Sequence, residues 1–82
     1  MPSTKKSRAP QTKVDWMGVG RRIRELRGFD MTQADFAARV GISQNYLSMM
    51  ERGQVEIGAE ILLGIGREFG KSIEWLLTGE DR

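Results

Sequence analysis

The chain has 82 residues, which is enough for one domain with one modest core. Apolar residues make up 39% of it, and no run approaches the roughly 18 apolar residues of a membrane span. The sequence has neither cysteine nor histidine, which excludes disulfides and most zinc sites and removes the usual general base. Because no apolar stretch follows the basic N-terminus, we expect a cytoplasmic protein rather than a secreted one.

The charge is unevenly distributed along the chain. Residues 1–13 carry four basic side chains and no acidic one, whereas the remainder carries nine basic and eleven acidic side chains. The segment is polar and contains two prolines, so it cannot bury enough surface to fold. We expect a flexible basic arm over residues 1–13. It either contacts nucleic acid through Lys5, Lys6 and Arg8 or is an ordinary solvated tail.

The rest of the chain predicts five short helices. The first begins at Trp16 after the candidate N-cap Asp15, and Gly28 ends it. The second and third each follow a capping hydroxyl, and a glycine ends each of them. These two caps are Thr32 and Ser43, and the two glycines are Gly41 and Gly53.

The fourth helix is expected from about Gly58 to Phe69, and a last short helix follows the cap Ser72 and ends at Thr78–Gly79. No segment shows the alternation of a strand. We therefore expect an all-α domain over residues 14–79, followed by a tail at 80–82. Two glycines inside the fourth helix, Gly64 and Gly66, either permit close packing or weaken the helix.

The most informative stretch runs from residue 32 to residue 53. Two short helices joined by a tight turn at Gly41 are typical of a helix-turn-helix, whose second helix keeps one face free. That free face can enter the major groove of DNA. Leu47 and Met50 are three residues apart and are expected to face the core. The outward residues are then candidates for reading bases, although each taken alone is also an ordinary surface residue: Gln44, Asn45, Ser48 and Met49.

The segment MTQADFAARVGISQNYLSMMERG, together with KSIEWLLTGE, resembles the lambda-repressor-like (Cro and XRE-type) helix-turn-helix family. The resemblance spans residues 21–79. It implies a five-helix bundle that binds operator DNA, usually as a dimer, and hence a transcriptional regulator, most often a repressor.

The resemblance also implies roles for single residues. Gln33 would hold a DNA phosphate at the start of the second helix and brace Gln44. Other backbone contacts would come from Thr32, Tyr46 and Arg52.

Two further positions have implied roles. Arg27 and Glu51 stand where similar proteins form a buried or half-buried ion pair that fixes the angle between helices. Met49 stands where a long polar residue is more usual, which favours apolar contact with a thymine methyl group. The link from Arg27 to Thr32 is one residue shorter than in the commonest family version.

An enzyme is not expected. The acidic pairs Asp30 with Asp35 and Glu56 with Glu60 are better explained as caps, first-turn charges and solvated surface. The glycines do not form a phosphate-binding loop, because no GxGxxG follows a strand. We expect no cofactor, metal or small-molecule ligand.

Two alternatives to a plain regulator remain. Antitoxins of toxin–antitoxin pairs have the same fold and bind both DNA and a toxin. A module that binds only protein would use the apolar C-terminal helix, with Trp75 and Leu76 as the candidate dimer or partner interface.

Overall fold

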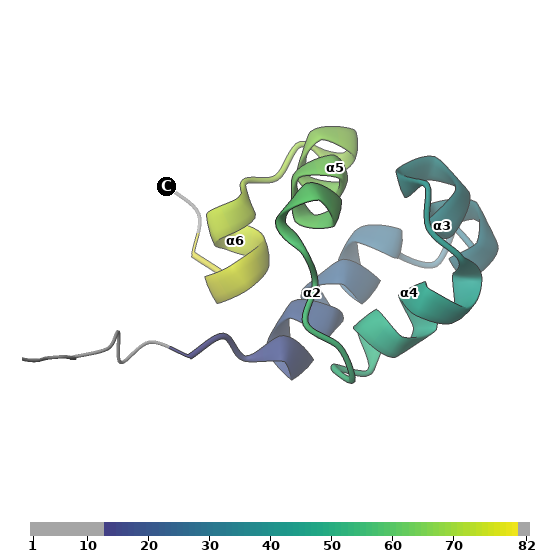
Figure 1. Cartoon of the computed structure of the whole chain (residues 1–82). Coiled ribbons are helices and arrows are strands. Elements are labelled where there is room, and N and C mark those ends of the chain that lie inside the picture. Colours follow the sequence, from purple (N-terminus) through teal and green to yellow (C-terminus); the bar gives the residue numbers. More distant parts are fainter. Residues whose placement is uncertain (1–12, 81–82) are drawn as a thin grey trace, which may run out of the picture.

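The computed structural model describes residues 13–80, and within them the chain forms five helices and no strand (Figure 1). The helices are α2 (Trp16–Arg27), α3 (Gln33–Val40), α4 (Gln44–Glu51), α5 (Ala59–Phe69) and α6 (Ile73–Thr78). The expected all-α, five-helix fold is confirmed. Most of the predicted arm, and residues 81 and 82 of the predicted tail, lie outside the described residues.

Side-chain caps determine where four of the helices begin. Each cap accepts a hydrogen bond from the backbone N–H three residues later, which satisfies one of the unpaired donors of a first turn. The caps are Asp15, Thr32, Ser43 and Ser72. α5 differs, because its N-cap Gly58 has no side chain to make this bond.

The turn between α3 and α4 depends on Gly41. Its backbone is left-handed, with φ 78° and ψ 31°, and its N–H donates to the carbonyl of Ala37 at the end of α3. Only glycine adopts this conformation without a steric cost. The chain therefore reverses within Gly41–Ser43, and α4 packs against α3.

The core lies where all five helices meet. α2 packs against α4 and α6, and α5 packs against α3 and α6. The rings of Phe36 and Phe69 stack with their centroids 4.8 Å apart, which joins α3 to α5. The side chains with essentially no exposed surface are Val19, Ile23, Phe36, Leu47, Met50, Ile65 and Leu76.

Two glycines mark places where backbones touch. A Cβ atom at Gly20 would lie 2.5 Å from the carbonyl oxygen of Met50 and 2.6 Å from that of Glu51, so only glycine lets α2 approach the end of α4 this closely. A Cβ at Gly66 would meet the carbonyl oxygen of Lys71 in the same way. Gly64 has open space around it, and packing does not explain it.

Candidate nucleic-acid interface

The four candidate base-reading residues lie on the side of α4 that faces away from the core. Leu47 and Met50 anchor the opposite side with no exposed surface. Among the candidates, Gln44 and Asn45 are exposed, whereas Ser48 and Met49 are half-buried. The first turn of α4 therefore presents two amide side chains to solvent on a helix whose other side is held in the core.

A buried carboxylate joins three helices beside this surface. The Glu51 side chain is 1% exposed, and the Arg27 guanidinium donates to both of its oxygens, from Nε at 2.8 Å and from Nη2 at 2.9 Å. Gln33 at the start of α3 donates from Nε2 to Glu51 Oε1 at 3.0 Å. Every buried side-chain polar atom in the described part of the chain has a hydrogen-bond partner.

The surroundings of Glu51 also set its charge state. Burial by itself raises the pKa of the Glu51 carboxyl, but the hydrogen bonds from Arg27 and Gln33, with the charges of Arg27 and Arg24, lower this pKa by more. The net effect is a pKa below the ordinary value for glutamate. The hydrogen bond to Glu51 raises the pKa of the Arg27 guanidinium, so both groups stay charged near neutral pH.

Gln33 is held differently from the sequence-based expectation. Its amide nitrogen is bonded to Glu51, and no hydrogen bond joins it to Gln44 within the described residues. The expected brace between Gln33 and Gln44 is thus absent from this structure. The other expected backbone contacts are placed as follows: Thr32 and Arg52 are exposed, and Tyr46 is half-buried.

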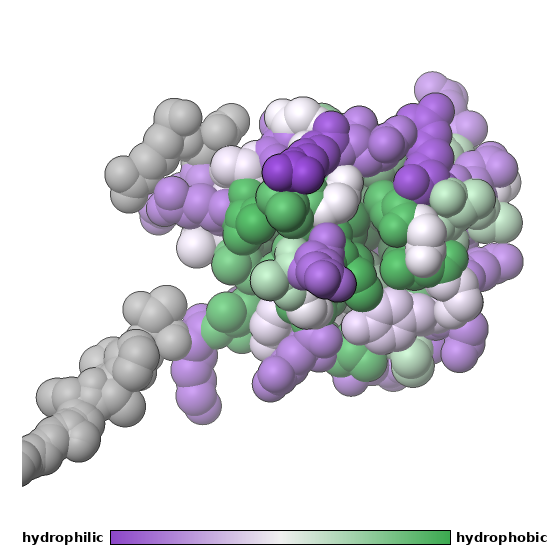
Figure 2. Space-filling view, turned by 45° about the horizontal axis from the view of Figure 1, so that its top comes forward, coloured by the Kyte–Doolittle hydropathy of each residue, from purple (hydrophilic) through white to green (hydrophobic). Residues whose placement is uncertain are grey.

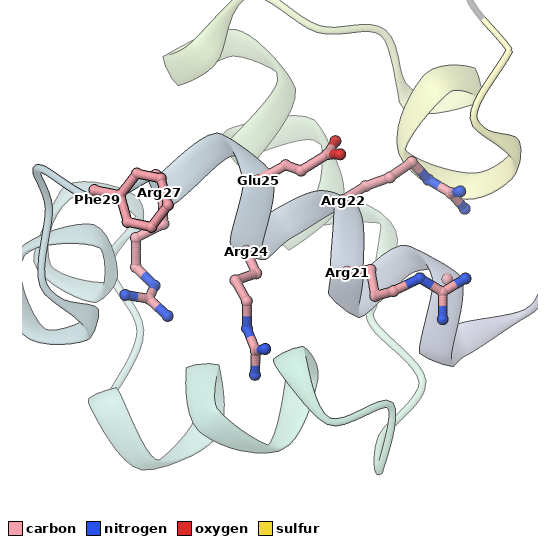
Figure 3. A pocket seen from close by; sticks show the side chains of 8 residues that line it. Arg21, Arg22, Arg24, Glu25, Arg27 and Phe29 are labelled. Carbon is pink, nitrogen blue, oxygen red and sulfur yellow. The ribbon is translucent and has the colours of Figure 1, made fainter.

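One residue at the edge of this surface was missed from sequence. The arginines of α2 line an open hollow that also includes Phe29 (Figure 3). Arg24 points from α2 toward α4, and its Nε lies 3.7 Å from Glu51 Oε1. The only sign of Arg24 in the sequence is its spacing of three residues from Arg27. Its position beside α4 could not be predicted, because α2 and α4 are far apart in sequence.

The predicted interface on α6 needs a correction. Leu76 is fully buried inside the protomer, so its side chain cannot contact a partner, and its assignment to an interface was wrong. The helical turn from Ser72 points Leu76 into the core, while its neighbour Trp75 stays half-buried. The Lys71 ammonium lies 4.7 Å from the centre of the Trp75 ring and covers part of it.

The described residues contain no group of three or more acidic side chains placed to hold a metal ion. None of their helices combines the length and apolar character needed to cross a membrane.

The sequence pattern of the helix-turn-helix family matches residues 21–76, which is more than half of the chain. The chain belongs to the helix-turn-helix family. Solved structures agree: the P22 c2 repressor, crystallised with a synthetic operator, superimposes with a TM-score of 0.70 and 31% identity over 84% of this chain and all of that one. The resemblance to lambda-like repressors is confirmed, and this fold and family are those of DNA-binding transcription regulators.

Two curated proteins are also similar to the chain. The propionyl-CoA carboxylase regulator of Cereibacter sphaeroides is 39% identical over 63 residues, which are 76% of this chain. The antitoxin PezA of Streptococcus pneumoniae is 38% identical over 65 residues, or 78% of this chain. The matched part spans only 14% of the length of the regulator and 40% of that of the antitoxin.

Proposed function

We propose that this chain binds specific duplex DNA sequences through α4 and regulates transcription, with repression of a promoter as its action. The observation that carries the proposal is the exposed polar side of α4, whose other side is locked into the core by Leu47 and Met50. A helix fits the major groove, and a rigidly mounted helix holds its side chains in register with the base edges.

The chemistry of the exposed side suits base recognition. The Gln44 and Asn45 amides each offer a donor and an acceptor, which pair with N6 and N7 of adenine. The Ser48 hydroxyl can donate or accept, and the Met49 thioether can pack against a thymine methyl group.

The start of α3 supplies a matching phosphate site. Thr32 and Asp35 form a capping box, in which the Thr32 hydroxyl accepts from the Asp35 N–H. The N–H groups of Gln33 and Ala34 then stay unpaired in the first turn, where they can bind a phosphate oxygen. Arg52 and Tyr46 from α4, and Lys5, Lys6 and Arg8 from the arm, are proposed as further backbone contacts.

We infer a homodimer on a palindromic operator, with the apolar surface of α5 and α6 as the contact. On these two helices, Leu63 is 40% exposed, and Ile73, Trp75 and Leu77 are half-buried. Figure 2 views the side on which α5 lies, and hydrophobic surface (green) appears there between hydrophilic residues (purple). A two-fold pair of protomers matches the symmetry of two inverted half-sites.

The test is selection of bound duplexes from a random pool at several salt concentrations, followed by sequencing. We expect an inverted repeat with half-sites about one helical turn apart. Gln44→Ala is expected to weaken binding by about 1–3 kcal/mol and to relax the preference at one base pair. Glu25→Ala, on the exposed side of α2 that points away from α4 (Figure 3), is the control and should keep the preference. No enrichment and no salt-sensitive binding would rule out the proposed function.

The match to PezA favours one second candidate, an antitoxin that binds DNA and also a toxin. Both candidates predict DNA binding, so the selection experiment does not separate them. Co-expression does: a gene product that arrests growth, and whose toxicity this chain relieves by direct binding, identifies an antitoxin.

A further inference from the structure

The arginines of α2 have different partners. Arg22 turns toward α6, where its Nε donates to the Leu76 carbonyl at 2.9 Å and so binds the end of that helix. Arg27 is paired with Glu51. Arg24 points toward the end of α4, and 63% of its side chain is exposed (Figure 3).

The negative charge of Glu51 does not compensate the positive charge of Arg24. Both carboxylate oxygens already accept hydrogen bonds of 3.0 Å or less from Arg27 and Gln33. Arg24 stands 3.7 Å away, beyond hydrogen-bond distance. Two guanidinium groups thus surround one carboxylate, and the excess positive charge lies on the more exposed arginine, Arg24.

The position of Arg24 relative to α4 follows from helical spacing. Glu51 comes three residues after Ser48 and seven after Gln44, so all three lie along one edge of α4. The contact at Gly20 brings α2 against the end of α4, and Arg24 follows one turn later on the same side of α2. Its guanidinium is therefore placed beside the edge of α4 that carries two candidate base-reading residues.

We propose that Arg24 binds a phosphate of the DNA strand that borders the groove entered by α4; this rests on the proposed function. A helix with its side chains is about 10–12 Å wide and the major groove about 12 Å, so the strand phosphates run close to the edges of the helix. A guanidinium presents paired N–H groups that match phosphate oxygens. The buried Glu51 holds Arg24 at this edge without neutralising it.

The test compares Arg24→Gln with Arg39→Gln, which removes the same charge from the exposed last turn of α3, outside the proposed DNA-binding and dimer surfaces. Affinity for the selected operator is measured across a salt series. Arg24→Gln should weaken binding roughly tenfold near 0.15 M salt and reduce the slope of log K against log salt by about 0.9. Arg24→Lys should restore the slope, and Arg39→Gln should keep both the affinity and the slope.

Two outcomes would overturn the inference while leaving the proposed function intact. The first is a wild-type chain that binds with a steep salt dependence and an Arg24→Gln variant with the same slope. The second is a changed base preference in Arg24→Gln, which would mean that Arg24 acts by shifting α4. A wild-type chain that binds no DNA would refute the proposed function itself.

Discussion

At the scale of single residues, the Arg27–Glu51 pair makes a prediction about stability. Replacing Arg27 with methionine leaves a carboxylate that is 1% exposed without its main partner. We expect the free energy of unfolding to fall by about 3–5 kcal/mol, measured by urea denaturation. Arg39→Met is the control, because the Arg39–Glu68 bridge is 3.8 Å long and exposed, and its loss should cost about 1 kcal/mol or less. Equal losses in both variants would contradict the prediction.

Glu51 also makes the stability of the domain depend on pH. The pKa of Glu51 is lowered in the folded state, so the folded state favours the ionised carboxylate. The resulting stability is fully present above the unfolded pKa, near 4.3, and is lost as the pH falls through the lower folded pKa. The difference in unfolding free energy between wild type and Glu51→Gln should therefore be constant from pH 7 to about 5 and shrink below about pH 4. If the difference in unfolding free energy between wild type and Glu51→Gln stays constant down to pH 2.5, the ionisation of Glu51 does not cause the pH dependence.

At the scale of helices, two glycines form a matched pair for mutation. Gly20→Ala would push a methyl group against the carbonyl oxygens of Met50 and Glu51 and separate α2 from α4. We expect a loss of about 1–3 kcal/mol in unfolding free energy, as for overpacking in a core. Gly64→Ala meets open space within a helix and should instead stabilise α5 by up to about 1 kcal/mol. The test is to measure the Tm of both variants by thermal unfolding. Equal shifts in Tm would refute the packing argument.

The helices could be predicted from sequence because their limits are set by local chemistry. A hydroxyl or carboxylate cap and a C-terminal glycine each bond to backbone groups no more than four residues away. The roles of Thr32, Ser43 and Gly41 could therefore be predicted from the sequence alone. The core side of each helix followed from its spacing. The need for glycine at position 20 was not readable, because it arises from a backbone about 30 residues further along the chain.

The candidate site was predictable only in part, for the same reason. The outward side of α4 follows from local periodicity, whereas the hydrogen bond of Gln33 and the place of Arg24 depend on how three helices meet at Glu51. The burial of Leu76 was missed because a six-residue helix does not reveal which of two adjacent leucines faces inward.

At the scale of the whole molecule, the point where the basic arm joins the domain is close to the end of α4. Met17, in the first turn of α2, packs against Gly53, because a Cβ at Gly53 would lie 2.8 Å from the Met17 Cα. Gly53 follows Arg52 directly. The arm therefore begins beside the surface proposed to bind DNA, and not on the opposite side of the domain.

This placement predicts the effect of removing residues 1–12. If basic arm residues bind phosphates, the slope of log K against log salt should fall by about 0.9 for every phosphate that the shortened chain no longer neutralises. Affinity should fall by a similar factor for specific and random duplexes, because phosphates carry no sequence information. A variant with Lys5, Lys6 and Arg8 replaced by glutamine keeps the length of the arm and should reproduce the change in slope. If the deletion weakens binding but this variant does not, the arm acts through something other than its charge; if neither changes the slope, the arm does not bind DNA.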